Sequence, residues 1–140
     1  MDMNNNPIYI VDDDRDEEVI LLEAMQELGL SNKMEFYHTA EELLDVLKVN
    51  PVVPFIIISD INLPRMDGFE LRSRIMEQAD IIEKSIPFIF WSTTASSAQV
   101  KKAFEMSVHG FFIKGRNYQD IKEGLNDIIH YWSRSLAPTP

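Results

Sequence analysis

A short apolar run that stops at a carboxylate is the feature that most constrains this chain. The run from Pro54 to Ser59 has the composition of a strand, and Asp60 follows it directly. A continuously apolar strand is typical of a parallel sheet that is covered on both faces. Pro64 and the pair Asp67-Gly68 mark a turn just beyond it. In open α/β sheets, ligands bind beyond the carboxyl ends of the strands, so Asp60 is expected to lie at the functional site of such a sheet.

Apolar strand patterns and helical patterns alternate along the rest of the chain. We predict strands at residues 8–11, 34–38, 54–59, 87–91 and 110–113. The helix boundaries are marked by capping and breaking residues, namely Asp14 with Glu17, Gly29, Thr39 with Glu42, Asn50-Pro51, Ser96 or Ser97, and Asn117. Five strands that alternate with five helices predict an α/β fold, a doubly wound, flavodoxin-like parallel sheet in the order 2-1-3-4-5.

Length and composition exclude several classes of protein. With 140 residues the chain fits one domain, which we place at residues 7–134, between an extended or disordered start at 1–6 and a tail at 135–140. The 13 basic and 23 acidic residues give a net charge of −10, which disfavours direct binding of nucleic acid. The chain has no cysteine, no apolar stretch long enough to span a membrane and no signal-peptide pattern, so we expect a cytoplasmic protein.

Polar side chains follow four of the five predicted strands. They are Asp12 and Asp13, Asp60, Ser92, and Lys114. Because parallel strands end at one edge of the sheet, we expect these groups to converge there. Neighbouring carboxylates repel one another, and both the Lys114 ammonium and a hard divalent cation would relieve that repulsion. Magnesium suits such a site, since it combines one or two carboxylates with waters and a phosphoryl oxygen.

This set of groups predicts phosphoryl transfer to a carboxylate. Asp60 would be the nucleophile, while the cation, Lys114 and Ser92 would hold the phosphoryl oxygens. The backbone carbonyl of Asn62 could complete the metal shell. Taken singly, each residue has a simpler interpretation: a helix cap or solvated loop for the aspartates, a loop hydroxyl for Ser92 and a surface lysine for Lys114. Their joint position after the strands favours the functional interpretation.

At this point the residues match a known family. The chain resembles the receiver domains of two-component response regulators over nearly its whole length. The matching segments are 11–13, 60–68 with its Asp-x-x-Leu-Pro-x-Met-Asp-Gly motif, 87–92 and 110–114. It resembles stand-alone regulators of the chemotaxis type, and its ending resembles a subgroup of small regulators, some of which serve phytochrome-type kinases.

The resemblance implies a role for each of these residues. Asp60 would accept phosphate from a histidine kinase or phosphotransfer protein, in a reaction that needs magnesium. Asp13 would ligate the cation directly, Asp12 would act close to it or through water, and the main-chain oxygen of Asn62 would be a further ligand.

Three residues would respond to the phosphoryl group. Ser92 would hydrogen-bond it, Lys114 would pair with it, and Phe111 would be the aromatic switch that turns inward. Such a protein signals through contacts with other proteins and is not a turnover enzyme.

Two departures from the family pattern leave alternatives open. Gly115 stands where proline, often after a cis peptide, is usual, and Thr93 stands where a small residue is common. A degenerate receiver that serves only as a docking scaffold is therefore an alternative. A phosphatase is a weaker one, because such enzymes place a second carboxylate where this chain has Asn62.

Output is expected through protein contacts, with no direct nucleic acid and no membrane partner. The surface that we expect to carry them combines the fourth helix, the fifth strand and the last helix. Its aromatic residues Phe104, Phe111 and Trp132 suggest homodimerisation there.

Overall fold

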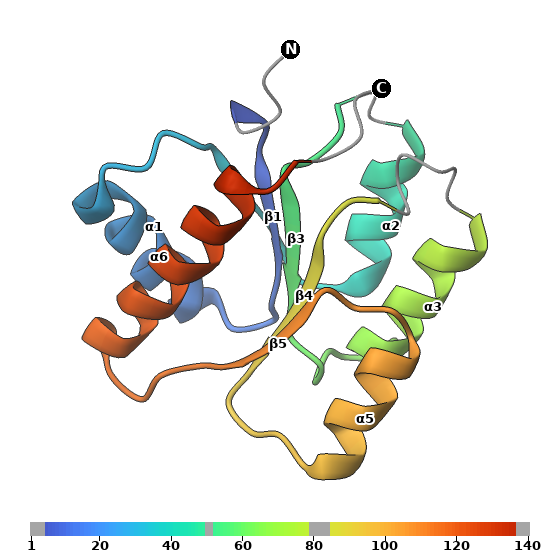
Figure 1. The fold of residues 1–140 in the computed structure, drawn as a ribbon. Helices are drawn as coiled ribbons and strands as arrows, with labels where there is room; N and C mark the ends of the chain where they lie inside the picture. Colours follow the sequence, from blue (N-terminus) through green and yellow to red (C-terminus); the bar gives the residue numbers. More distant parts are fainter. Residues whose placement is uncertain (1–4, 50–51, 79–84, 137–140) are drawn as a thin grey trace.

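The computed structural model describes residues 5–49, 52–78 and 85–136. In this part of the chain five strands alternate with five helices. The strands are β1 (Ile8–Val11), β2 (Met34–Tyr37), β3 (Ile56–Ser59), β4 (Phe88–Ser92) and β5 (Gly110–Ile113). The helices are α1 (Arg15–Leu28), α2 (Ala40–Val49), α3 (Gly68–Gln78), α5 (Ser97–Glu105) and α6 (Tyr118–Arg134). All neighbouring strands pair in parallel in the order β2-β1-β3-β4-β5, which confirms the predicted fold and strand order (Figure 1).

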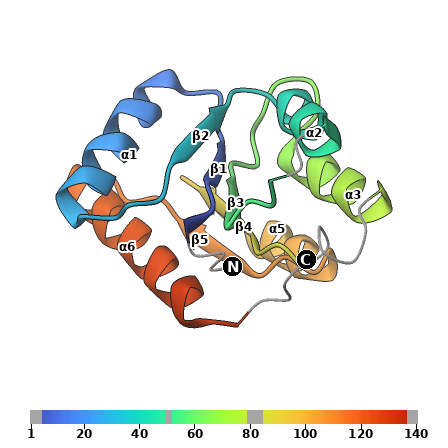
Figure 2. The same cartoon turned by 90° about the horizontal axis from the view of Figure 1, so that it is seen from above.

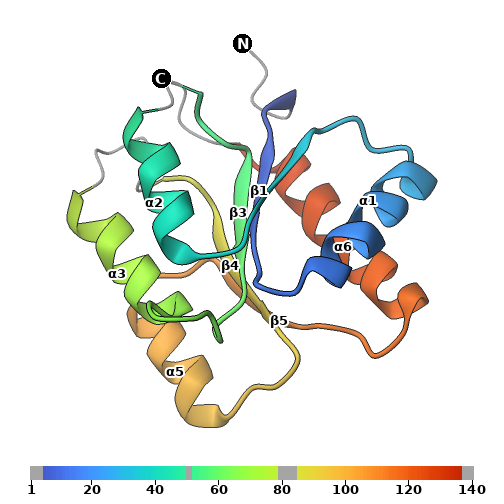
Figure 3. The ribbon, with the colours of Figure 1, turned by 180° about the vertical axis from the view of Figure 1, so that it is seen from behind.

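The helices form a layer on each side of the sheet. Helices α1 and α6 lie together on one face, whereas α2, α3 and α5 cover the other, as the view along the sheet in Figure 2 shows. The reverse view in Figure 3 places α2, α3 and α5 in a row beside the strands. No helix in the described ranges is both long and apolar enough to cross a bilayer.

Alternate residues of the strands feed two separate cores. In β1, Ile8 and Ile10 pack toward α1 and α6, while Tyr9 and Val11 pack toward α2 and α3. Every residue of β1, β3 and β4 is buried, as a sheet covered on both faces requires. Trp91 of β4 is 2% exposed and belongs to the core beneath α6.

The N-terminal cap of α1 differs from the prediction. Asp14 is the N-cap, but its carboxylate accepts a hydrogen bond from the amide of Asp16. Glu17 does not complete a capping pair, because its carboxylate contacts Lys114 instead. The prediction of an Asp14–Glu17 pair was therefore wrong, and the difference brings a further acid to the edge of the sheet.

The other helix boundaries agree more closely with the sequence signals. Gly29 ends α1 with φ at 67°, in the left-handed region that favours glycine. Ser96 caps α5 in a complete capping box with Gln99, and Asn117 caps α6. The predicted helix end at Asn50-Pro51 lies outside the described residues.

Candidate functional site

The strand register brings the predicted polar residues to one edge of the sheet. Val11 pairs with Ser59 on the neighbouring strand, so Asp12 and Asp60 leave the sheet side by side. The amide of Asp60 donates to the carbonyl of Val11 at 2.9 Å. On the other side of β3, the backbone carbonyl of Ser92 at the end of β4 accepts a 2.8 Å hydrogen bond from the amide of Lys114, which follows β5.

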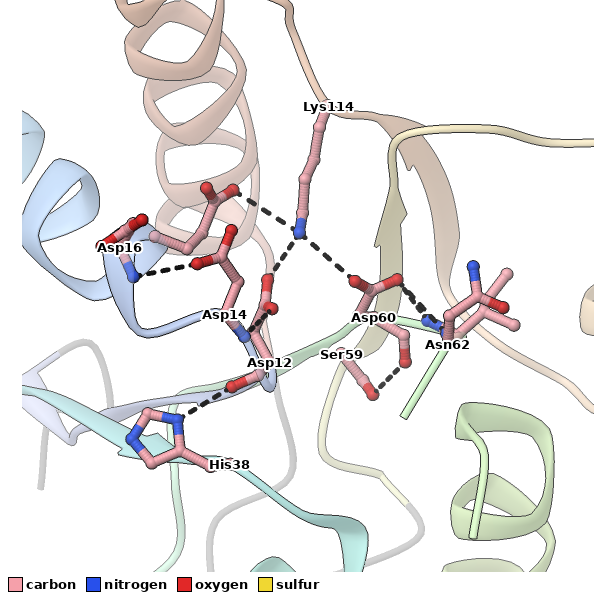
Figure 4. Close-up of polar contacts among 10 residues, drawn as sticks. Asp12, Asp14, Asp16, His38, Ser59, Asp60, Asn62 and Lys114 are labelled. Atoms are coloured by element: carbon pink, nitrogen blue, oxygen red, sulfur yellow. Dashed lines mark hydrogen bonds and ion pairs between the residues drawn. The ribbon is translucent and has the colours of Figure 1, made fainter. Parts of the chain in front are cut away.

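Lys114 is the centre of the site. Its Nζ lies 2.5 Å from Oδ2 of Asp12 and 3.5 Å from Oδ2 of Asp60 (Figure 4). Oε1 of Glu17 lies 3.5 Å from the same nitrogen. Only 8% of the Lys114 side chain is exposed, so these ion pairs are largely shielded from solvent. One buried ammonium thus contacts three carboxylates that come from three different segments of the chain.

Asp60 forms an acidic group with two other aspartates. One carboxylate oxygen from each of Asp12, Asp13 and Asp60 lies within 4.8 Å of the others. Asp12 is buried and Asp13 is exposed, so the group opens to solvent on the Asp13 side. Carboxylate oxygens at such spacing are ligands that hard divalent cations prefer. This acidic triad could therefore bind a metal ion.

Backbone amides hold the Asp60 carboxylate in place. Oδ1 accepts hydrogen bonds from the amides of Ile61 at 2.7 Å and Asn62 at 3.4 Å, which leaves Oδ2 toward Lys114 (Figure 4). Burial raises the pKa of Asp60; Lys114 and these two amides lower it, whereas Asp12 raises it further, and the net pKa is raised.

Burial and neighbouring charges also determine the pKa values of Lys114 and Glu17. Burial alone would lower the pKa of Lys114, but the nearby carboxylates, with Asp12 first among them, outweigh it and the pKa is raised. Burial also raises the pKa of the Glu17 carboxyl, and Lys114 only partly offsets that effect. The pocket therefore holds an excess of negative charge that one ammonium does not neutralise.

The other residues predicted for the site are Ser92, Phe111 and Asn62. Ser92 is 1% exposed, and its buried Oγ has no hydrogen-bond partner within the described ranges. Phe111 is half-buried, and its ring packs edge-to-face against Phe90 at 6.0 Å between centroids. Asn62 is exposed at the rim and donates its amide to Asp60.

Gly115 and Thr93, the two departures from the family pattern, directly follow Lys114 and Ser92. No peptide bond in the described segments is cis, so the Lys114–Gly115 bond is trans. A Cβ at Gly115 would overlap Asp120 at the start of α6, which explains why glycine suits this position. Thr93 is exposed beside the buried Ser92.

Two residues near the pocket were not predicted as part of it. Glu17 contacts Lys114, and His38 places its Nδ1 3.0 Å from the backbone carbonyl of Asp12 (Figure 4). Both come shortly after the end of a strand in the sequence. Glu17 is in the first turn of α1, which follows β1, and His38 comes directly after β2. That placement is the only sequence signal that could have identified them.

The sheet carries three aspartates and a buried lysine at its carboxyl edge. This arrangement is typical of proteins that bind a metal ion or a phosphoryl group through aspartate side chains. Residues 8–126 match the family described as the response regulator receiver domain, so the chain belongs to that family. Receiver domains are signalling proteins rather than enzymes, which removes the phosphatase alternative.

Individual relatives support the assignment. The chain is 29% identical over 122 residues to a chemotaxis protein CheY homologue from Campylobacter jejuni, covering 87% of this chain and 91% of the relative. The crystal structure of the phosphorylated cyanobacterial phytochrome response regulator RcpA has the same fold, with a TM-score of 0.86, 21% identity and coverage of 96% of this chain and 99% of that one. The Mn²⁺-bound form of the response regulator Rcp1 gives a TM-score of 0.82 at 21% identity, with coverage of 96% and 99%.

Proposed function

We propose that this chain is a phosphoacceptor of a two-component system: it accepts a phosphoryl group on Asp60 from a histidine kinase or phosphotransfer protein and signals through protein contacts. The receiver unit would span residues 7–134. The observation that carries the proposal is the position of the Asp60 carboxylate, which belongs to the acidic triad and lies 3.5 Å from the Lys114 ammonium. The transfer forms a bond between an Asp60 oxygen and phosphorus while the bond from phosphorus to the donor imidazole breaks, and the imidazole nitrogen keeps that electron pair.

The donor set fits a magnesium ion. Asp13 and Asp60 would be direct ligands, Asp12 would act close to the ion or through water, and the backbone carbonyl of Asn62 would complete the protein ligands. All are oxygen atoms, and Asp13 leaves the group open to solvent, as an ion that retains several waters requires. When bound, such a cation neutralises charge that develops on the phosphoryl group. The Mn²⁺-bound form of Rcp1 supports a divalent cation in this fold.

The Lys114 and Ser92 side chains would hold the phosphoryl oxygens. Lys114 supplies three donors on a positive charge that already lies 3.5 Å from Asp60. The Ser92 hydroxyl is buried and has no partner in the described residues, so a hydrogen bond to a phosphoryl oxygen would satisfy it. Phe111 packs against Phe90, which lies two residues before Ser92 in β4, so movement of Ser92 would be passed to Phe111, which would transmit the signal to the surface.

Phosphotransfer from the host's histidine kinases tests the proposal. Each kinase is first phosphorylated with labelled ATP and then mixed with this chain and Mg²⁺. We expect rapid transfer from one cognate kinase, a label that hydroxylamine removes as it does from an acyl phosphate, and the modified residue at Asp60 by mass spectrometry. Absence of an acyl phosphate with every kinase and with small phosphodonors would instead support a docking scaffold.

We further propose that a homodimer forms through α5, β5 and α6. Phe104, Ile113 and Tyr131 on these elements are 53%, 56% and 66% exposed, and large exposed apolar side chains favour association. Sedimentation is expected to show dimers once beryllofluoride and Mg²⁺ occupy the Asp60 site. A monomer with and without this phosphoryl mimic would contradict the proposal.

A further inference from the structure

A fourth carboxylate, that of Glu17, lies in the pocket and has no part in the function proposed above. Glu17 is in the first turn of α1, and only 12% of its side chain is exposed. Its Oε1 lies 3.5 Å from Nζ of Lys114 and accepts no hydrogen bond from any residue in the described ranges. Burying a carboxylate oxygen that accepts no hydrogen bond costs free energy, and the ion pair with Lys114 at 3.5 Å is too long to replace a hydrogen bond fully. A functional role of Glu17 would therefore lie in its contact with Lys114.

The contacts of Lys114 suggest what that role is. An ammonium group has three donors, and here three carboxylates surround it. The contact with Asp12 at 2.5 Å is the shortest, whereas those with Glu17 and Asp60 are both 3.5 Å. The two longer contacts are the ones that an arriving anion can most easily replace.

A phosphoryl group on Asp60 would need Lys114 and would meet the charge of Glu17. Phosphorylation replaces the single charge of the Asp60 carboxylate with about 1.5 to 2 negative charges on the phosphoryl group, beside the three carboxylates of Asp12, Asp13 and Glu17. We propose that Glu17 is a positioning residue that competes with the phosphoryl group for Lys114 and so limits how tightly the pocket holds a phosphoryl group. This inference rests on the proposed phosphorylation of Asp60 and adds a determinant of its stability.

Beryllofluoride binding to the full chain measures this competition. Binding is followed at saturating Mg²⁺ by ¹⁹F NMR and by the fluorescence of Trp91, which directly precedes Ser92 in β4. Glu17→Gln keeps the size of the side chain and removes its charge. We expect it to bind beryllofluoride more tightly than the wild type, by on the order of tenfold, because one like charge is lost a few ångströms from the bound group.

Binding of Mg²⁺ alone separates competition from a general structural effect. Removing a negative charge is not expected to increase affinity for a cation, so Glu17→Gln should bind Mg²⁺ no more tightly than the wild type. A variant that was merely damaged would not gain affinity for beryllofluoride. Glu17→Met provides a second neutral side chain of similar length and is expected to give the same gain.

Asp16→Asn is the matched control, since Asp16 neighbours Glu17 in the same turn but is exposed. It removes the same charge and is expected to change beryllofluoride affinity less than twofold. Equal or weaker binding in both Glu17 variants, or an equal gain in Asp16→Asn, would overturn the inference. Failure of the wild type to bind beryllofluoride would instead contradict the proposed function, so the two failures are distinguishable.

Discussion

Replacing Asp60 with asparagine is expected to abolish phosphate incorporation and, without a divalent cation, to raise the free energy of unfolding by about 1 kcal/mol. The first effect follows because an amide cannot form the acyl phosphate. The second follows because Asp60 is partly buried beside Asp12 and Asp13, and the loss of one like charge relieves repulsion. Label transfer from a phosphorylated kinase and urea unfolding in EDTA measure the two effects.

The stability difference should depend on pH in a defined direction. Because the folded protein raises the pKa of Asp60 above its ordinary value of 3.8, the folded state binds this proton more tightly than the unfolded state. That contribution to stability is fully present below the ordinary value and is lost as the pH rises through the raised one. The advantage of Asp60→Asn should therefore be largest near neutral pH and shrink in acid.

Asp45→Asn provides the control for net charge. Asp45 is exposed on α2, so this variant removes one charge far from the pocket. It should incorporate phosphate like the wild type, with unfolding changed by less than about 0.5 kcal/mol. A destabilised Asp60→Asn in EDTA would show that the pairing of Asp60 with Lys114 outweighs repulsion in the triad.

The fold and much of the pocket could be predicted because the signals for them are local. Apolar runs identify the strands, and parallel pairing fixes where the residue after each run must lie. Asp12, Asp60 and Lys114 were predicted to converge by that rule, and the carboxylates of both aspartates contact the Lys114 ammonium. Their convergence needed only the strand order, which the alternation of strands and helices had already supplied.

Two helical residues were not predicted as part of the site or the core, because their positions depend on the direction in which the side chain leaves the helix. Glu17 can cap its helix or turn toward Lys114, and only the three-dimensional pocket decides between them. Arg72 on α3 is 1% exposed and donates at 3.1 and 2.7 Å to the carbonyls of Met106 and Ser107, at the end of α5. These partners are 34 and 35 residues away in sequence, so no local pattern marks Arg72 as buried.

Gly68→Ala is expected to be strongly destabilising, lowering the free energy of unfolding by roughly 3 kcal/mol. A Cβ at this position would lie 2.5 Å from the carbonyl oxygen of Asp60 and 2.9 Å from Cα of Ile61. Both are backbone atoms, so no side-chain rotation can relieve the overlap. The Gly68 amide also donates to the carbonyl of Ile61 at 2.8 Å, which holds the two segments together.

The same overlap should also slow the phosphorylation of Asp60, because the displaced segment begins at Asp60 itself. A shift of the Asp60 backbone would move its carboxylate relative to Lys114 and the other aspartates, and misplacement by about 1 Å can cost on the order of a hundredfold in rate. Phosphorylation by a small phosphodonor, measured well below the unfolding temperature, should therefore slow in Gly68→Ala.

Gly124→Ala is the control: its Cβ would meet the Trp91 ring at an ordinary 3.4 Å, and alanine inside α6 should stabilise the protein by about 0.5–1 kcal/mol. If Gly68→Ala unfolded and reacted like the wild type, the segment after Asp60 would have to yield easily, and the fixed position of Asp60 could not be what prepares it for phosphoryl transfer.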